Sequence, residues 1–367
     1  MALLDRYDPP PARHVYRWDL DKTYLATEFD SLRDLLKTAF QKAADKVNVP
    51  GTATLMRELR LNGITPNRVC IISGSPRQMR RVLEEKLHLD GATWDEFVLK
   101  PNLENIMRGR FKAVRDQVGY KLPALLESRA RTPADAEETL FGDDAEADGF
   151  IYSLYADIVA GRVDQELLGK ILDAAHVYPD SARAVLKFAS EIEKKDAVRR
   201  IFIHLDRKSP PSKFAGFGAR LVPIYNYFQA ALVLMADGHL NSLSVAKVSA
   251  EMVANYGYSM LTLGNSFQDL VRRGLPVAPL ATALTDALQG DNPLNHLLRP
   301  TPNILAAFAK RLASLGAIPA PSAPVQLDYL ALLDHAMPRK KGKKERRPEP
   351  GRGPSGPLGD EPEEEAG

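Results

Sequence analysis

The first part of the chain alternates between short apolar runs and stretches in which apolar residues recur with helical spacing. Strand-like runs are found at His14–Trp18, Val69–Ile72, Phe97–Leu99, Thr139–Phe141 and Arg199–Leu205. Val69–Ile72 is apolar throughout, as expected of a strand that is buried on both faces. Between the runs, helical patterns cover Phe29–Val47, Arg77–Leu87 and Leu122–Arg129. Strands that alternate with helices predict an α/β fold with a doubly wound parallel sheet.

The pattern changes after about Arg207, where helical periodicity dominates. We therefore expect three parts: an α/β domain at residues 1–207 with a helical insert at about 164–196, a helical C-terminal region at 208–337, and a tail at 338–367. The tail runs from a basic stretch through proline and glycine to an acidic end. Because it cannot bury enough apolar surface to fold alone, we expect it to be disordered.

The most apolar segment is Leu221–Ala236. It contains Pro223 and is shorter than the ~20 residues that a membrane-spanning helix needs, so we interpret it as a buried helix. The first fourteen residues are charged and rich in proline and lack the apolar stretch of a signal peptide. These features predict a cytoplasmic protein without a transmembrane segment.

Composition narrows the possible functions. Hydrophobic residues make up 44% of the 367 residues and charged residues 26%, which is typical of a globular protein. Lys and Arg number 49 against 47 Asp and Glu, so no global field attracts nucleic acid or anionic lipid. The single cysteine, Cys70, excludes an internal disulfide and a cysteine-based zinc site, and its apolar surroundings indicate a core position.

The candidate chemistry begins directly after the first strand, with Asp19, Asp21 and Thr23 in an Asp-x-Asp-x-Thr pattern. The carboxyl end of a strand is where open α/β sheets bind ligands. Of two carboxylates placed there, one can attack phosphorus while the other handles a proton. The motif has only three fixed residues, so it gains weight only from its context.

Two further motifs supply groups that bind phosphate. Ser73 and Gly74 end the second strand, where a hydroxyl and the backbone N–H groups of the following turn can hold phosphate oxygens. A helix cap is an equally good interpretation of this segment taken alone. Lys121 stands at the predicted start of a helix, where a fixed ammonium could neutralise phosphate charge, although most lysines are solvated surface residues.

The last motif is an acidic loop after the fourth strand, with Asp143, Asp144, Glu146 and Asp148 within six positions. Clustered carboxylates repel one another, and a bound Mg²⁺ is a good reason for gathering them, because it prefers hard oxygen ligands. A solvated acidic loop is the alternative. Since all four motifs fall at strand ends or helix starts, we expect them to converge at one edge of the sheet.

Together these motifs resemble those of the haloacid-dehalogenase-like (HAD) superfamily of phosphotransferases. Within it, the chain looks most like the catalytic domain of the actin-patch-type phosphatidate phosphatases, which is distantly related to that of lipins. The resemblance covers about residues 14–163, with a shorter piece at 197–205. Its cues are Val49-Pro50-Gly51, Ile72-Ser73-Gly74-Ser75-Pro76, Tyr120-Lys121-Leu122 and the run from Gly142 to Tyr152.

The resemblance implies roles for individual residues. Asp19 is expected to be the nucleophile that forms an aspartyl-phosphate, and Asp21 the acid that protonates the leaving group and then activates water. Thr23, Ser73, Gly74 and Lys121 are expected to bind the phosphoryl group. Mg²⁺ is expected to bind Asp19, the backbone carbonyl of Asp21 and Asp143, supported by Asp148 and Asp144.

The resulting expectation is a Mg²⁺-dependent phosphomonoester hydrolase that acts on a phosphorylated substrate, with phosphatidate at a membrane surface as one candidate. Alternatives are a phosphatase of phosphoproteins, nucleotides or nucleic-acid ends, and a non-catalytic binding module on the same fold. The near-neutral charge argues against nucleic acid. The segments between the motifs are too short for a large cap domain, so we expect the C-terminal helical region to cover part of the site or to select the substrate.

Overall fold

The computed structural model describes residues 13–26, 46–62, 67–100, 114–289 and 326–336, together with residues 307 and 310. The chain divides into a compact unit, Met1–Met337, and a second unit, Pro338–Gly367. Nearly all of the predicted helix Phe29–Val47 and the whole predicted tail lie outside the described residues. Every helix and strand of the described ranges belongs to the first unit.

Six parallel strands form one sheet in the order β3-β2-β1-β4-β5-β6. The strands are β1 (His14–Trp18), β2 (Arg68–Pro76), β3 (Glu96–Lys100), β4 (Glu137–Asp143), β5 (Val198–His204) and β6 (Leu221–Ile224). The strand order reverses between β1 and β4, which are neighbours in the sheet although they are far apart in the chain. Ligands of open α/β sheets bind outside the carboxyl ends of the strands at such a switch point.

The five strands predicted from the apolar runs are confirmed, but the sixth was missed. Leu221–Ile224 is strand β6, and the helix expected over the whole apolar segment begins only at Tyr227 as α9 (Tyr227–Ala236). Strand and helix lie in one largely apolar segment, and the boundary between them is marked by Asn226, whose side chain caps α9 and accepts from the Gln229 N–H. Pro223 is tolerated because β6 is an edge strand, where one side of the backbone has no ladder to complete.

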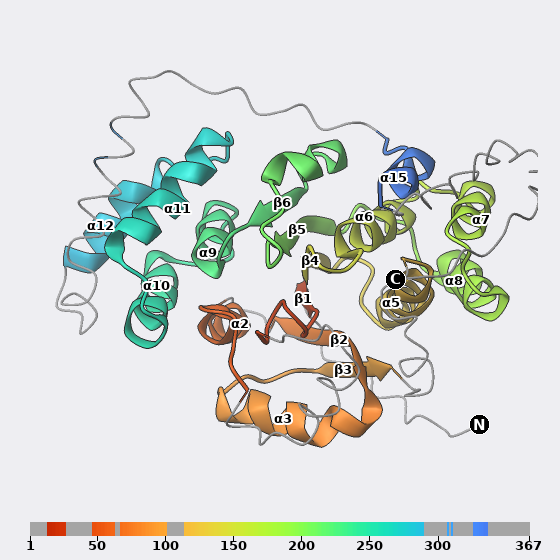
Figure 1. The fold of residues 1–367 in the computed structure, drawn as a ribbon, viewed down its shortest axis with the longest axis horizontal. Helices are drawn as coiled ribbons and strands as arrows, with labels where there is room; N and C mark the ends of the chain where they lie inside the picture. The colour runs from red at the N-terminus through yellow and green to blue at the C-terminus, as the bar shows by residue number, and fades with distance from the viewer. Residues whose placement is uncertain are drawn as a thin grey trace, which may run out of the picture. The chain divides into compact units, whose positions relative to one another are not determined.

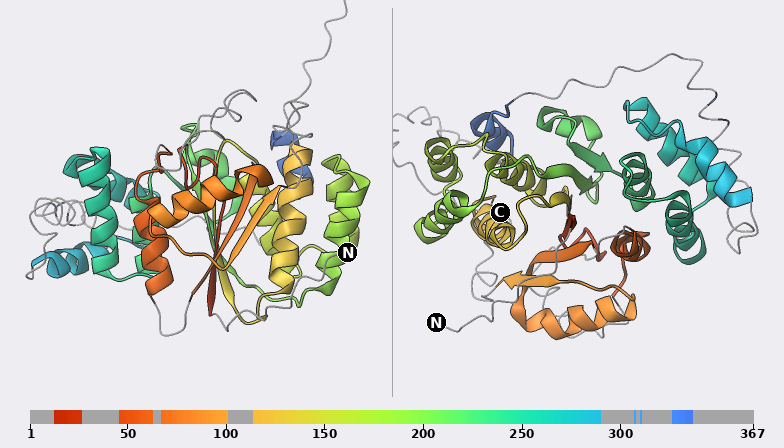
Figure 2. Two further views of the ribbon diagram at one scale, coloured as in Figure 1. Left: turned by 90° about the horizontal axis from the view of Figure 1, so that it is seen from below. Right: turned by 180° about the vertical axis from the view of Figure 1, so that it is seen from behind.

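Helices flank the sheet on both faces, and each face has its own apolar core (Figures 1 and 2). One core contains residues of α2 (Thr52–Leu61), α3 (Arg80–Leu89), α9, α10 (Ser242–Tyr256), α11 (Met260–Arg272) and α12 (Leu280–Gln289). The other contains residues of α5 (Val114–Ala130), α6 (Asp148–Val159), α7 (Gln165–Ala174), α8 (Pro179–Glu191) and α15 (Tyr329–Ala336). The molecule is thus an α/β protein with an all-parallel sheet between two helical layers.

Two helical predictions need comment. The stretch at about 164–196 is helical as expected and forms α7 and α8, which begin at an Asp164 cap and at Pro179. The helix expected over Leu122–Arg129 is longer, because α5 already begins at Val114 and contains Pro123. Lys121, predicted at the start of a helix, therefore lies in the middle of α5.

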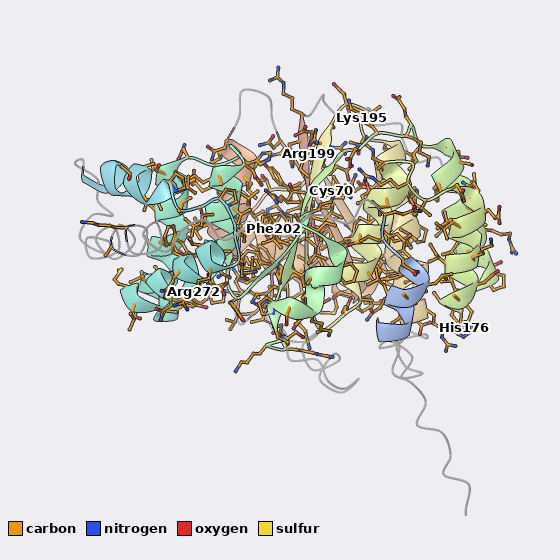
Figure 3. All side chains as sticks on the ribbon, turned by 90° about the horizontal axis from the view of Figure 1, so that it is seen from above. Cys70, His176, Lys195, Arg199, Phe202 and Arg272 are labelled. Atoms are coloured by element: carbon orange, nitrogen blue, oxygen red, sulfur yellow. The ribbon has the colours of Figure 1, made fainter. Side chains whose placement is uncertain are left out.

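The sheet also continues past residue 207, the predicted end of the α/β domain, because β6 pairs with β5. A short 3₁₀ helix, Pro211–Phe217, leads into β6. Cys70 is fully buried in β2 beside Val15 and Ala136, and Figure 3 places it with Phe202 in the interior of the protein. None of the helices in the described ranges has both the length and the apolar character needed to cross a membrane.

Candidate active site

The carboxyl ends of β1, β2 and β4 bring several of the predicted residues together. Asp19 follows β1, and its backbone N–H donates to the Phe141 carbonyl of β4 at 3.0 Å. Asp143 is the last residue of β4, and Asp148 is the first of α6. Lys121 reaches this edge from α5. These residues therefore lie at one edge of the sheet, at the switch point between β1 and β4.

Three carboxylates surround the Lys121 ammonium. Its Nζ lies 2.5 Å from Asp148 Oδ1, 2.7 Å from Glu146 Oε2 and 3.4 Å from Asp19 Oδ1. The Lys121 side chain is only 1% exposed. Burial alone would lower the pKa of the ammonium, but the three carboxylates raise it well above its ordinary value, so Lys121 stays charged.

Two buried carboxylate oxygens at this site receive no hydrogen bond from the described residues: Asp19 Oδ1 and Asp143 Oδ2. The second oxygen of Asp143 accepts from the backbone N–H groups of Ala145 at 2.5 Å and Glu146 at 3.0 Å. Thr23 Oγ1 donates to Asp19 Oδ2 over a long 3.4 Å. Buried oxygens without hydrogen-bond donors are costly, and this pair favours a further positive group beside the Lys121 ammonium.

The excess negative charge of the buried carboxylates also favours a bound cation. Burial, together with the neighbouring carboxylates, holds the pKa of Asp19 and of Asp143 well above the usual range, and burial also raises the pKa of Asp148. A bound cation reverses this effect, because it favours the ionised form of every carboxylate around it. Hard oxygen donors suit Mg²⁺ or a similar ion. The site thus fits a divalent cation on charge and on donor chemistry.

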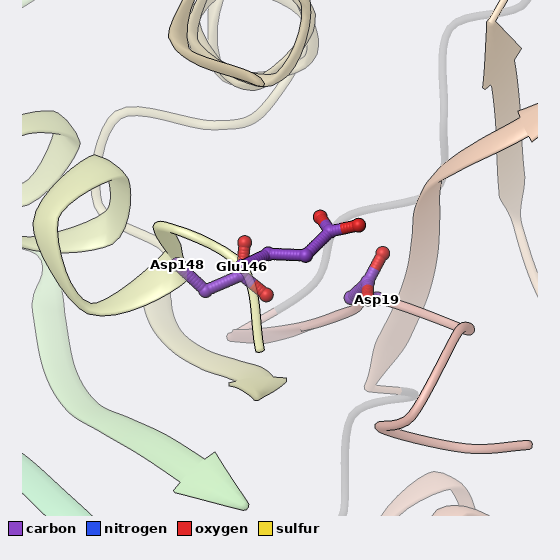
Figure 4. A group of neighbouring side chains, drawn as sticks. All are labelled: Asp19, Glu146 and Asp148. Carbon is purple, nitrogen blue, oxygen red and sulfur yellow. The ribbon is translucent and has the colours of Figure 1, made fainter. Parts of the chain in front are cut away.

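Glu146 belongs to the predicted acidic loop, but the motif assigns it no role of its own. Oxygen atoms of Asp19, Glu146 and Asp148 all lie within 4.8 Å of one another, so these three residues could hold a metal ion. Figure 4 shows the Glu146 side chain extending from the loop after β4 toward Asp19. The available signal was its place inside the acidic loop, but a position between two motif residues does not reveal which way a side chain turns.

Asp144, in contrast, is not brought into this cluster. Its two oxygens accept from the backbone N–H groups of Arg207 at 2.8 Å and Ser209 at 3.1 Å. The carboxylate therefore anchors the loop that follows β5 and is engaged away from the predicted metal site. Of the predicted metal residues, only Asp19 and Asp148 belong to the close group of three, and Asp143 adds its unpartnered oxygen.

Asp21 is held by two serine hydroxyls. Its Oδ2 accepts from Ser75 Oγ at 2.6 Å and from Ser73 Oγ at 3.2 Å. Asp21 is partly exposed, whereas Ser73 is fully buried, and Gly74 lies between the two serines in β2. Burial among protein atoms raises the pKa of Asp21, and the serine hydrogen bonds oppose this rise. Ser75 was not predicted as a site residue.

The turn that carries Asp21 is fixed from β5 and α9. Lys22 has a left-handed backbone with φ of 60°, and its carbonyl lies 2.9 Å from His204 Nδ1 at the end of β5. The ring of Tyr227, the first residue of α9, packs 5.7 Å from the His204 ring and 5.8 Å from that of Trp18, measured between centroids. The segment after residue 208 thus supports the site from one face of the sheet.

Comparison of the chain with protein-family models, with curated proteins and with solved structures finds no match. The resemblance to HAD phosphatases is carried by the motifs and their spacing alone.

Proposed function

We propose that this protein is a Mg²⁺-dependent phosphomonoester hydrolase of the HAD type, with Asp19 as the nucleophile. The observation that supports this most strongly is the position of Asp19 at the switch point of a parallel sheet, with an oxygen that accepts no hydrogen bond and lies 3.4 Å from the Lys121 ammonium. A purely structural ion pair gains nothing from a buried carboxylate oxygen without a hydrogen bond, whereas a nucleophile needs an oxygen that can attack phosphorus.

In the first half-reaction Asp19 attacks the phosphorus of the substrate, and the bond from phosphorus to the leaving oxygen breaks. Asp21 donates its proton to that oxygen, and the raised pKa of Asp21 favours the protonated form that this step needs. The hydroxyls of Ser75 and Ser73 hold the Asp21 carboxyl group in one orientation. Lys121 offsets part of the negative charge on the phosphoryl group.

In the second half-reaction Asp21, now ionised, takes a proton from water, and the resulting hydroxide attacks the phosphorus of the aspartyl-phosphate. The acyl phosphate bond to Asp19 breaks, phosphate leaves, and both carboxyl groups return to their starting states. Asp19, Asp143, Asp148 and the backbone carbonyl of Asp21 would hold the Mg²⁺ ion. When bound, it supplies positive charge to the carboxylates and to the phosphoryl oxygens.

The substrate class we propose is a phosphomonoester, with phosphatidate as the lipid candidate. The proposed location is the cytoplasm, with peripheral contact to a membrane if phosphatidate is the substrate. Phosphoproteins, nucleotides and nucleic-acid ends are the other substrates to be tested. A binding module that retains the fold without turnover is the remaining alternative.

The test is phosphate release from para-nitrophenyl phosphate by the full chain, with and without Mg²⁺, beside Asp19→Asn. Wild type should turn over with Mg²⁺ and stop with a chelator, and Asp19→Asn should be at least about a thousandfold slower, since the nucleophile is lost. The matched control is Asp180→Asn, because the Asp180 side chain is 91% exposed and contacts only surface charge. The proposal is contradicted if the wild type releases phosphate from none of these substrates: aryl phosphate, phosphatidate vesicles, phosphopeptide and nucleotides.

A further inference from the structure

Glu146 makes a contact that the proposed reaction cannot keep. An ammonium has three N–H donors, and Lys121 directs its two shortest contacts to Asp148 at 2.5 Å and Glu146 at 2.7 Å. Asp19 Oδ1, at 3.4 Å, receives no hydrogen bond from it. A phosphoryl group that is attacked by Asp19 and bound by Lys121 must lie between these two side chains. The Glu146 carboxylate already lies there, with an oxygen within 4.8 Å of an Asp19 oxygen and 2.7 Å from Lys121 Nζ, so this carboxylate and its negative charge must move away.

The two close partners of Lys121 differ in how firmly they are held. Asp148 is fully buried at the start of α6, and its second oxygen accepts from the backbone N–H of Asp143 at 3.2 Å. The Glu146 side chain is 19% exposed, and among the described residues its carboxylate pairs with Lys121. It is also longer by one methylene and emerges from a loop. Glu146 is therefore the partner that can leave.

We propose that the Glu146 carboxylate is an internal anion that occupies the phosphoryl-binding position and is displaced when a phosphorylated substrate binds. This inference rests on the proposed function. A carboxylate resembles a phosphoryl group in charge and in the oxygen atoms it presents to an ammonium. Glu146 thereby weakens the binding of every phosphoryl group that must displace it, including free phosphate, the product.

The alternative role for Glu146 is that of a permanent metal ligand, which its distances to Asp19 and Asp148 allow. The two roles predict opposite effects of Glu146→Gln. Loss of a competing anion strengthens phosphate binding and leaves the Mg²⁺ requirement unchanged. Loss of a metal ligand raises the Mg²⁺ concentration needed for half-maximal activity and weakens phosphate binding.

The experiment measures the inhibition constant of inorganic phosphate and the Mg²⁺ midpoint for the full chain and for Glu146→Gln, with phosphate binding followed in parallel by calorimetry. We expect phosphate to bind at least tenfold more tightly to Glu146→Gln, with an unchanged Mg²⁺ midpoint. Glu146→Asp, whose side chain is shorter by one methylene and so weakens the contact with Lys121, should shift phosphate binding in the same direction. The control is Glu166→Gln, because the Glu166 side chain is 79% exposed on α7.

The outcomes separate this inference from the proposed function. If wild type hydrolyses esters but Glu146→Gln binds phosphate equally or less tightly, the internal-anion role is wrong and the hydrolase stands. If wild type shows no turnover but Glu146→Gln binds phosphate more tightly by calorimetry, the internal anion is supported and the reaction is wrong. If neither protein binds phosphate, both proposals are wrong.

Discussion

Replacement of Lys121 by methionine tests the electrostatics of the site without relying on activity. Methionine preserves most of the apolar volume and removes the charge that Asp148, Glu146 and Asp19 share. Removing one partner of a buried ion pair typically costs about 3–5 kcal/mol, because the remaining charges stay buried without compensation. Two of the three carboxylates are at most 1% exposed, so we expect a loss within that range in the free energy of unfolding.

The assay is urea unfolding followed by circular dichroism, with a chelator present, at pH 5.5 and at pH 8. Burial raises the pKa of Asp19, Asp143 and Asp148 in the folded protein, so the folded state binds protons more tightly there than the unfolded state does. Stability from such groups is present at low pH and is lost as the pH rises through the raised pKa values. The deficit of Lys121→Met should therefore be larger at pH 8 than at pH 5.5.

The matched control is Lys187→Met on α8, whose side chain is 68% exposed and lies 3.9 Å from Glu191. A surface pair of this kind contributes about 0–1 kcal/mol. If Lys121→Met loses no more stability than Lys187→Met, or loses more at pH 5.5 than at pH 8, the electrostatic account of the site is refuted.

Four further predictions concern other parts of the molecule. Burial tends to raise the pKa of Glu138, but Arg17 and Arg129 hold this pKa at about 2 instead of 4.5. The shift corresponds to about 3 kcal/mol of stability, which is present above pH 4.5 and is lost as the pH falls toward 2. Acid unfolding followed by circular dichroism should show that Glu138→Gln lacks this loss of stability between pH 4.5 and 2. Identical acid profiles for wild type and variant would contradict the role of the Glu138 carboxylate. Asp21→Asn should lower kcat by about 10²–10⁴-fold, and the loss should be larger for esters with poor leaving groups than for aryl phosphates. An equal loss for the two kinds of substrate excludes Asp21 as the acid. Asp144→Asn should leave the Mg²⁺ midpoint unchanged, because its carboxylate anchors the backbone of Arg207 and Ser209, and a raised midpoint would restore Asp144 to the metal site. Tyr329→Phe should lower the free energy of unfolding in urea by about 1–3 kcal/mol, because the Tyr329 hydroxyl contacts Asp157 at 2.6 Å and the Ser153 carbonyl at 2.8 Å. A smaller loss would mean that these contacts contribute little to stability.

The parallel sheet could be predicted because its strands are short apolar runs separated by helical patterns. Val69–Ile72 was recognisable as a fully buried strand, and it lies inside β2. β6 was not recognised, because Leu221–Ile224 is short and only Tyr225 and the helix cap Asn226 separate it from the apolar helix α9. Its strand conformation depends on pairing with β5, a tertiary contact that local periodicity does not encode.

The site was predictable only as far as strand ends determine position. Asp19 and Asp143 are fixed by the ends of β1 and β4, and the switch point between these strands brings them together. The acidic loop between Asp143 and Asp148 is different, because its side chains choose among several partners. Asp144 turns to the backbone after β5 and Glu146 turns to Lys121, and the spacing of the motif does not distinguish these two directions.

Covalent trapping tests the central claim most directly. The full chain is mixed with radiolabelled phosphomonoester and Mg²⁺, quenched in acid within the first turnover, reduced with borohydride and analysed by mass spectrometry. The account predicts that label is retained on the protein after the acid quench, and that reduction then releases the labelled phosphate and converts residue 19 to homoserine, with neither result in Asp19→Asn. Turnover without a labelled protein, or label on a residue other than Asp19, would contradict it.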